Sequence, residues 1–315
     1  MYTFGVDLGG TSTKLALVSS DGRILQDRRL RTVANQPPMD AIAEFRPVVE
    51  EMITSAGYRY PPPAGIGIGI PGVVDYRSGW LTLSGPLGWK DVAVGELGRT
   101  VFECDVVVDT DVNAGALADL HLGNAREASE MLYISWGTGI GAGLVVSRKL
   151  YHTRGGAMCN LGHIVADPLS KMRCYCGCTG CLEVEAGGKS MVIQANDALD
   201  QGESSMLSDL GEVTPEQISK AASLGDPLAQ RILHRSAVLM ARVLGGVLAL
   251  LNPDTVIFGG GVSSCLPVIR SVFDDELRLR TPSFSIGLTT LSQSIFGESA
   301  GVVGASLLPL ASSEQ

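Results

Sequence analysis

A turn near the N-terminus combines glycine, hydroxyl and acidic side chains in a pattern suited to binding a phosphate group. The apolar residues of Phe4–Val18 favour two strands joined by a tight turn whose N–H groups point at one spot. Asp7, at the end of the first strand, could hold a divalent cation directly or through water. The phosphate donors are the backbone of Gly9 and Gly10 and the hydroxyls of Thr11, Ser12 and Thr13. An ordinary hairpin turn has the same composition, so this segment alone leaves both interpretations open.

A similar turn occurs downstream. In Met131–Val146, the residues Gly137-Thr138-Gly139 again join two apolar segments that favour strands. A repeat at such long spacing indicates two similar domains that face each other, each offering a phosphate-binding turn to one shared ligand.

Acidic residues follow a short apolar strand, Val106–Val108, which we expect to be a central parallel strand. Ligands of open α/β sheets bind at the carboxyl ends of such strands. The next residues are Asp109-Thr110-Asp111-Val112-Asn113, before a helix expected to begin near Ala114. Either aspartate could simply cap that helix. Two aspartates and an asparagine between two phosphate-binding turns favour catalysis instead.

Four cysteines crowd into the segment Cys174–Cys181, and His163 lies eleven residues upstream of the first. Three thiolates and one imidazole are a common tetrahedral ligand set for zinc, and the glycines between them allow the chain to fold round one ion. Spacing alone does not decide which three of Cys174, Cys176, Cys178 and Cys181 bind.

Three consecutive glycines, residues 259–261, follow another apolar strand and lead into Val262 and Ser263. Backbone without side chains can lie flat against a planar ligand such as adenine or ribose. A simple flexible turn explains the glycines equally well.

Composition limits the classes of protein that the chain can be. Its 315 residues are 45% hydrophobic, enough for two domains with sizeable cores, and its net charge of −9 argues against binding nucleic-acid backbones. The longest apolar segment, Val238–Leu251, contains Arg242 and is too short to span a bilayer, and the N-terminus predicts a strand instead of a signal peptide. Seven cysteines, an odd count, without a secretion signal favour a reduced cytoplasm.

The remaining elements follow from periodicity and breaker residues. Trp89 lies in a loop, where we expect it to pack rather than bind a ligand. The expected strands are 24–31, 64–70, 254–258 and 289–291, and the expected helices are 39–56, 188–199, 214–224, 226–251, 266–278 and 300–310.

The two phosphate turns resemble those of the actin-like ATPase superfamily, and nearly the whole chain resembles the ROK family of bacterial sugar kinases. The motifs that carry this resemblance, in chain order, are GVDLGGTSTK, GIGIPGVVD, LGW, DTDVNAG, WGTGIGAG, LGH, CYCGCTGCLE and FGGGVS. The resemblance implies an α/β, two-domain actin-like ATPase (ribonuclease H-like) fold with ATP and sugar in the interdomain cleft. We expect an N-terminal domain of residues 1–112, completed by the C-terminal helix at about 300–315, and a larger domain of residues 113–299 that carries the zinc loop.

The resemblance also assigns roles. It implies that Asp111 is the general base of a phosphotransferase acting on an alcohol, with Mg²⁺ accompanying ATP. The ATP-binding positions are Asp7, Gly9, Gly10, Thr11, Thr13, Lys14, Gly137, Thr138 and Gly139, with Gly260 and Gly261 against the nucleoside. The substrate-binding positions are Gly72, Thr110, Asp111, Asn160, His163 and Glu183. The structural Zn²⁺ ligands are His163, Cys174, Cys176 and Cys181, which leaves Cys178 as an extra thiol.

Three departures from the glucose-kinase pattern concern the substrate. The family pattern has Asn where this chain has Thr110, Glu where it has Asn160, and Asn-Leu where Gly85-Pro86 precede Leu87. An unpaired hydroxyl in a closed pocket costs roughly 1–3 kcal/mol, so plain glucose is expected to be a poor substrate. An amino sugar, a cyclitol or another modified hexose fits better, with the phosphate going to its exocyclic hydroxymethyl group.

Other functions are weighed against this interpretation. Some ROK proteins are repressors with a DNA-binding helix-turn-helix before the kinase-like core, but this acidic chain begins at the first strand. A catalytically weak sugar sensor is the alternative that the altered sugar contacts favour. Polyphosphate is a possible donor besides ATP. The resemblance implies a cytoplasmic homodimer or homotetramer that binds neither nucleic acid nor a membrane.

Overall fold

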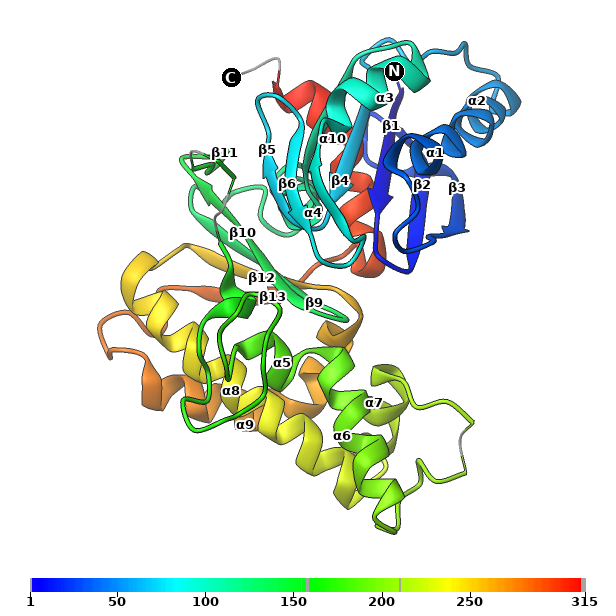
Figure 1. Ribbon diagram of the computed structural model, residues 1–315. Coiled ribbons are helices and arrows are strands. Elements are labelled where there is room, and N and C mark those ends of the chain that lie inside the picture. The colour runs from blue at the N-terminus through cyan, green and yellow to red at the C-terminus, as the bar shows by residue number, and fades with distance from the viewer. Residues whose placement is uncertain (1, 154, 157–158, 210, 313–315) are drawn as a thin grey trace. The chain divides into compact units, whose positions relative to one another are not determined.

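The computed structural model describes residues 2–153, 155–156, 159–209 and 211–312 (Figure 1). Its contacts divide the chain into two compact units. Unit 1 comprises Met1–Ser129, Gly143–Met158 and Ser294–Gln315, and unit 2 comprises Glu130–Ala142 and Cys159–Gln293. Unlike the predicted division after residue 112, this one groups helix α4 (Asp111–His121) and residues 143–158 with unit 1. Residues 313–315 of the predicted terminal helix lie outside the described residues.

The main sheet of unit 1 has the strand order β3-β2-β1-β4-β8. Strands β1, β2 and β3 are antiparallel, whereas β4 and β8 run parallel to β1. Their bounds are β1 Tyr2–Leu8, β2 Ser12–Ser19, β3 Ile24–Arg31, β4 Ile66–Ile70 and β8 Val106–Thr110. This order places the carboxyl ends of β1, β4 and β8 at one edge of the sheet, where the predicted site residues Asp7 and Asp111 lie.

Strand β8 is parallel, as predicted, but it is not central: it forms the edge of the sheet. The prediction was wrong because an apolar sequence shows that a strand is buried and not that it has strand neighbours on both sides. Here helices bury the edge strand. Helices α3 (Val94–Phe102) and α10 (Ala300–Ser312) both contact β8, so Val106 and Val108 are buried at an edge position.

The predicted helix over residues 39–56 is interrupted. Helix α1 spans Pro38–Ala43, α2 spans Phe45–Ser55, and Glu44 separates them. Pro47 has no amide hydrogen to donate to the carbonyl of Ala43, which explains the break.

Glycines in the sheet of unit 1 admit the C-terminal helix. A Cβ at Gly5 would lie 2.1 Å from the carbonyl oxygen of Val302, and one at Gly67 would lie 1.7 Å from that of Ala305. Helix α10, red in Figure 1, therefore rests directly on the backbone of β1 and β4. The glycine-rich strand predicted to admit either a chain segment or a ligand thus admits a chain segment.

A smaller antiparallel sheet of unit 1 has the order β5-β6-β7. Its strands are β5 Val73–Asp75, β6 Trp80–Ser84 and β7 Trp89–Val92. Trp89 begins β7 instead of lying in the predicted loop, but it is buried and donates a 2.8 Å hydrogen bond from Nε1 to the carbonyl oxygen of Gln36, which confirms its packing role.

The second five-stranded sheet has the order β11-β10-β9-β12-β13, and the division between units falls within β10. Strand β12 runs parallel to both β9 and β13. The strands are β9 Met131–Trp136, β10 Ile140–Val146, β11 Lys149–Leu150, β12 Thr255–Gly259 and β13 Thr290–Gln293. The helices of unit 2 are α5 Leu182–Ala186, α6 Gly188–Asp200, α7 Pro215–Ser223, α8 Pro227–Leu251 and α9 Leu266–Arg280.

Helix α8 has the length and apolar composition of a membrane span, the only such helix among the described residues. However, 61% of its most apolar window is buried inside the protein. Core helices of water-soluble proteins satisfy the same test, and α8 contacts α5, α6, α7 and α9. We therefore interpret α8 as the central core helix of unit 2.

Gly304→Ala tests the packing of α10. The new Cβ would lie 1.6 Å from the carbonyl oxygen of Ala114 in α4, so one helix must shift. We expect a loss of about 1–3 kcal/mol in the free energy of unfolding, measured by urea denaturation. The matched control is Gly246→Ala in α8, where nothing lies within 4 Å and a gain of about 0.5–1 kcal/mol is expected. Equal effects of the two substitutions would contradict this packing.

Candidate functional site

The first glycine turn joins β1 to β2 in unit 1. A Cβ at Gly10 would lie 2.6 Å from the Cβ of Pro86, so this turn needs glycine for close packing. Thr11 is exposed, whereas Thr13 is buried and its hydroxyl lies 2.9 Å from the hydroxyl of Thr32. Of the two threonines predicted to contact phosphate, Thr11 is the one whose side chain faces solvent.

Lys14 is engaged within unit 1. Its Nζ donates to the carbonyl oxygen of Glu298 at 2.5 Å and lies 3.4 Å from the carboxylate of the same residue. Arg29 reaches that carboxylate at 3.9 Å and donates to the Ser12 hydroxyl at 3.2 Å. These contacts place two cations beside the first turn and tie it to residues 297–299, which precede α10.

Asp7 ends β1 in an environment that disfavours its negative charge. Burial raises the pKa of this carboxyl to about 7, the charge of Asp111 adds to the increase, and Lys14 and Arg29 oppose it. A bound divalent cation would favour the ionised form, so this carboxyl fits the predicted role of a Mg²⁺ ligand.

The acids after β8 have different surroundings. Asp109 is buried, and its carboxylate accepts hydrogen bonds from the backbone of Thr110 at 2.7 Å and the side chain of Asn113 at 2.8 Å. Its other oxygen lies 2.7 Å from Nε2 of His152, whose ring stacks on Tyr76 at 3.7 Å. Asp109 therefore organises the local structure.

Thr110, and neither aspartate, caps α4: its hydroxyl accepts a 3.2 Å hydrogen bond from the amide of Asn113. Asp111 is the first residue of the helix, and its carboxylate accepts from the amide of Val112 at 2.9 Å. The positive end of the helix dipole favours a negative charge at this position. The alternative that Asp111 or Asp109 is the helix cap is thereby removed.

The second glycine turn lies in unit 2 and is held by the start of α6. The amide of Gly188 donates to the carbonyl of Gly137 at 2.8 Å, and that of Lys189 donates to the carbonyl of Thr138 at 3.1 Å. Thr138 is exposed. The carbonyls of the turn are thus directed into the protein, while its threonine remains accessible to a ligand.

The triple-glycine loop lies beside this second turn. Gly260 has φ of 81°, and a Cβ there would lie 2.6 Å from the carbonyl oxygen of Trp136. Strands β9 and β12 are parallel neighbours, so the turn after β9 and Gly260 and Gly261 after β12 share one edge of the sheet. This arrangement brings the predicted phosphate and nucleoside contacts of unit 2 together.

The four predicted zinc ligands converge. The ligand atoms of His163, Cys174, Cys176 and Cys181 all lie within 4.8 Å of one another. Nδ1 of His163 is 3.4 Å from the sulfur of Cys174, and the sulfurs of Cys176 and Cys181 are 3.6 Å apart. Cys178 is exposed and stands outside this cluster. One imidazole and three thiols fit a tetrahedral zinc ion.

Glu183 links this cluster to the second turn. Its carboxylate accepts a 2.9 Å hydrogen bond from the amide of Ile140, and a Cβ at Gly139 would lie 2.3 Å from the same oxygen. A Cβ at Gly162, next to His163, would lie 3.2 Å from the Cβ of Glu183. His163 and Glu183, both predicted to contact the substrate, are therefore neighbours in unit 2.

Two further predicted substrate positions lie in turns. Gly72 has φ of 135°, and a Cβ there would lie 2.2 Å from the carbonyl oxygen of Leu83, so the small sheet of unit 1 requires glycine. Asn160 precedes the 3-10 turn Leu161–His163, and its carbonyl accepts from the amide of His163 at 2.9 Å.

The sequence did not indicate two polar contacts, one of a half-buried and one of a buried side chain. His152 pairs with Asp109, and Glu185 is completely buried against Arg235, 2.5 Å away. A glutamate between the apolar residues Val184 and Ala186 is an available signal for Glu185. Its partner lies fifty residues downstream and has no local signature.

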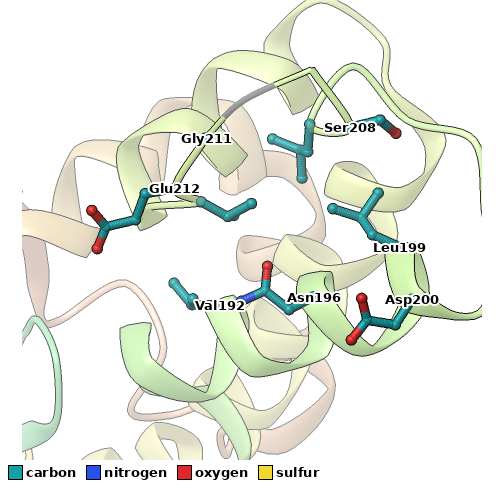
Figure 2. A pocket seen from close by; sticks show the side chains of 9 residues that line it. Val192, Asn196, Leu199, Asp200, Ser208, Gly211 and Glu212 are labelled. Atoms are coloured by element: carbon teal, nitrogen blue, oxygen red, sulfur yellow. The ribbon is translucent and has the colours of Figure 1, made fainter.

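A pocket of about 410 Å³ opens between α6 and residues 207–208 and 211–213 (Figure 2). None of the predicted site residues lines it. Its walls combine Val192, Leu199 and Leu207 with the carboxylates of Asp200 and Glu212, which disfavour a phosphate ligand. We therefore do not place the predicted site there.

Comparison with known proteins gives one family and several relatives. The sequence model of a protein family described as the ROK family matches residues 3–312 of this chain. The glucokinase of Thermotoga maritima is 31% identical over 308 residues, which cover 96% of this chain and 95% of that protein.

Solved structures are similar along the whole chain. A ROK family glucokinase from Streptomyces griseus, in complex with glucose and AMPPNP, has a TM-score of 0.84 and 28% identity, covering 97% of this chain and 98% of that one. A ROK family transcriptional regulator, a homologue of the E. coli MLC protein, has a TM-score of 0.85 and 26% identity, covering 98% of this chain and 78% of that one.

The pKa of Asp7 predicts a pH-dependent stability of the metal-free protein. The folded carboxyl, with a pKa of about 7, keeps a proton that the unfolded chain, with a pKa of 3.8, has lost. The free energy of unfolding should therefore fall as the pH rises from about 4 to about 7, by up to roughly 4 kcal/mol. Asp7→Asn should remove most of this slope in urea denaturation and be the more stable form above about pH 7. The same slope in both proteins would contradict the assignment.

The cysteine cluster predicts different effects of two neighbouring substitutions. Cys176 and Cys178 are both exposed, but only Cys176 belongs to the cluster. Cys176→Ser should lower zinc affinity by about 10-fold or more, whereas Cys178→Ser should leave it unchanged. Zinc content after dialysis against a chelator measures the difference. Loss of zinc in both variants, or in neither, would contradict the ligand assignment.

Proposed function

The chain belongs to the ROK family, and from that membership we propose that it is an ATP-dependent kinase of a sugar or sugar-like alcohol. Its fold is that of the actin-like ATPases, as the sequence predicted. The observation that carries the proposal is the position of Asp111: the carboxylate stands on the first residue of α4, while Thr110 performs the capping.

Asp111 is the general base in this proposal. The substrate hydroxyl gives its proton to the carboxylate while its oxygen forms a bond to the γ-phosphorus of ATP. The bond from that phosphorus to the bridging oxygen breaks, and ADP leaves with the electron pair. The helix N-terminus favours the ionised carboxylate that accepts the proton.

The other groups bind and orient the phosphates and the nucleoside. Asp7 would hold Mg²⁺, which supplies positive charge to the phosphoryl oxygens. Gly9, Gly10 and Thr11 of unit 1 and Gly137, Thr138 and Gly139 of unit 2 would donate to phosphates. Gly260 and Gly261 would lie against the nucleoside. The contacts of Thr13 and Lys14 within unit 1 support a role in shaping the first turn.

A structural zinc ion is part of the proposal. His163, Cys174, Cys176 and Cys181 would hold it, and it would fix the loop that presents His163 and Glu183 to the substrate. Zinc would supply local rigidity, whereas the reaction itself proceeds on the groups named above.

The proposed substrate is a hexose or hexose-like compound phosphorylated on its exocyclic hydroxymethyl group. Thr110 and Asn160 replace longer side chains of the glucose-kinase pattern, and Thr110 already accepts a hydrogen bond from Asn113. Fewer partners for sugar hydroxyls favour an amino sugar or a cyclitol over plain glucose. ATP is the proposed donor, with polyphosphate as the alternative.

A second candidate function is sugar sensing with weak catalysis. It is favoured by the similarity to a ROK transcriptional regulator along 98% of this chain. In either case we propose a cytoplasmic homodimer or homotetramer.

Asp111→Asn tests the base. The substitution keeps the shape of the side chain and leaves the Thr110 cap in place, but the amide cannot accept the proton. We expect kcat to fall by about 10²–10⁴-fold with little change in melting temperature. ADP formation is measured with Mg-ATP and a panel of glucose, mannose, N-acetylmannosamine, kanosamine, allose and C7 cyclitols.

The matched control is Asp105→Asn, because this exposed acid lies at the opposite end of β8 and should not affect turnover. Turnover on one compound that survives the Asp111 substitution would overturn the role of the base. Tight ATP and sugar binding with no turnover on any compound would favour the sensor.

A further inference from the structure

Helix α5 joins two functional parts of unit 2 although it has only five residues, Leu182–Ala186. The metal-cluster residue Cys181 comes directly before it, and Gly187 separates it from α6, whose first amides hold the second turn. A helix this short has too few internal hydrogen bonds to be stable by itself. Its orientation therefore depends on the groups that it contacts.

On one side, α5 is tied to the second turn. Glu183 accepts from the amide of Ile140 at 2.9 Å, and the carbonyl of Ala186 accepts from Nε1 of Trp136 at 2.8 Å. Trp136 and Ile140 flank the turn Gly137-Thr138-Gly139. A rotation of α5 would move these contacts.

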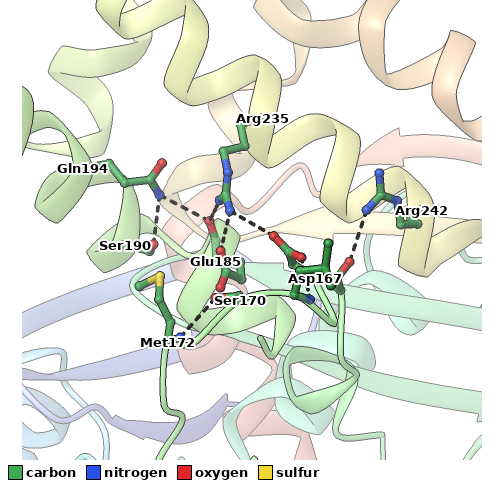
Figure 3. Close-up of polar contacts among 10 residues, drawn as sticks. Asp167, Ser170, Met172, Glu185, Ser190, Gln194, Arg235 and Arg242 are labelled. Carbon is green, nitrogen blue, oxygen red and sulfur yellow. Dashed lines mark hydrogen bonds and ion pairs between the residues drawn. The ribbon is translucent and has the colours of Figure 1, made fainter. Parts of the chain in front are cut away.

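On its other side, α5 is tied to α8 by one side chain. Nη2 of Arg235 lies 2.5 Å from Oε2 of Glu185, and Nη1 donates to the carbonyl oxygen of Glu185 at 3.0 Å (Figure 3). Arg235 therefore grips both the side chain and the backbone of one α5 residue. Gln194 of α6 donates to the same carbonyl at 3.3 Å.

Arg235 also reaches the chain that leads to the metal cluster. Its guanidinium lies 3.7 Å from the carboxylate of Asp167, and Arg242, two turns further along α8, donates to the carbonyl of Ala166 at 3.3 Å. Residues 166 and 167 both donate to the carbonyl of Gly180, at 2.8 and 3.2 Å, next to the ligand Cys181. Arg235 thus contacts the chain near both ends of residues 164–181, the loop that carries the three cluster cysteines and is here called the metal loop.

Glu185 needs its ion pair with Arg235 because its side chain is completely buried. Its second oxygen, Oε1, has no hydrogen-bond partner among the described residues, so Arg235 is the cation that compensates this carboxylate. A buried carboxylate that loses its partner must move toward water or be neutralised. Movement toward water would turn α5, and Glu183 with it, whereas neutralisation would leave α5 without the ion pair that fixes its orientation.

We propose that Arg235 is a positioning residue that orients α5 through Glu185, and so holds the metal loop and Glu183 in register with the second turn. The inference deepens the proposed kinase function and rests on it for the kinetic part. The effect on the metal loop is independent of turnover.

Arg235→Met removes the cation and keeps much of the side-chain volume. Groups that support metal ligands typically contribute 10–100-fold to metal affinity or activity, so zinc release should accelerate by about that factor. Release is followed with a zinc-indicator dye in the wild-type protein and the variants. Amide hydrogen exchange of residues 180–187 should also accelerate, while that of α7 should not.

Two further variants protect the test against misfolding. Glu185→Gln keeps the shape and an acceptor oxygen, so its protein should fold and show a smaller acceleration. Arg235→Lys keeps the charge but cannot grip the side chain and the carbonyl of Glu185 together, so its zinc release should fall between those of the wild type and Arg235→Met.

Kinetics distinguish positioning from general destabilisation. In Arg235→Met, KM for the alcohol substrate should rise by about 10-fold or more, because Glu183 is displaced. KM for ATP should change by less than about twofold, because the amides of Gly188 and Lys189 still hold the second turn.

Arg231→Gln is the matched control. Arg231 lies one turn earlier on α8 and pairs with Glu203 through two bonds of 2.8 and 2.7 Å at the surface. Such a pair contributes little, so zinc release and both KM values should match the wild type.

The outcomes separate cleanly. Zinc release and exchange in Arg235→Met equal to those of Arg231→Gln would overturn the inference, as would a wild-type chain that binds no zinc. Equal losses of ATP and alcohol binding without recovery in Arg235→Lys would also overturn it. If no alcohol is phosphorylated by the wild type but zinc release follows the expected order, the kinase proposal fails and the positioning role of Arg235 stands.

Discussion

The placing of two acids, Asp7 and Asp111, close together is a constraint that unit 1 must accommodate. The parallel strands β1, β4 and β8 end at one edge of the sheet, and this brings Asp7 and the start of α4 together. Burial, and to a smaller extent the charge of Asp111, raise the pKa of Asp7, so the fold holds this acid where its negative charge is disfavoured. Helix α10 packs closely on the same strands at Gly5 and Gly67, and a Cβ at its Gly301 would lie 2.8 Å from the carboxylate of Asp7, so this helix helps to enclose the acid.

In unit 2 the predicted functional groups lie on short segments that connect longer helices and strands. The second turn, the triple-glycine loop and α5 have few internal hydrogen bonds and are each fixed by a neighbour. The start of α6 holds the turn, Trp136 contacts Gly260, and α5 is gripped by Trp136 and Arg235. The residues that hold these segments belong to β9, α6 and α8, which are regular elements with buried faces.

The sequence predicted the elements of this fold well where local chemistry decides them. Thr214 and Gln217 form the capping box that begins α7, and Asp226 caps α8, as the residue types indicate. The edge position of β8 could not be predicted because its buried, apolar character comes from helix packing, by α3 just before it and by the distant α10, and not from strand neighbours on both sides. For the candidate site, the crowded cysteines indicated a metal cluster, and the family resemblance predicted its four ligands and the role of Asp111. Neither could find that Thr13 pairs with Thr32, or that Arg235 meets Glu185, because these pairings depend on register and on helix packing.

The order of the metal loop depends both on ligands that the sequence indicates and on packing contacts that only the structure shows. Within residues 164–181 the described backbone has two isolated bridges, Val165–Cys181 and Arg173–Thr179, and no strand or helix. A segment with so little regular structure gains little from backbone hydrogen bonds, so the binding of a metal ion there would contribute directly to the folding free energy. An ion constrains its ligands relative to one another and not relative to the rest of the protein. The ends of the loop must therefore be held by other contacts. The contacts of α8 with Ala166, Asp167 and Glu185 hold the chain near those ends. The four predicted ligands, which the family resemblance singles out, and the arginines of α8, which only the structure reveals, would therefore act together to order the loop.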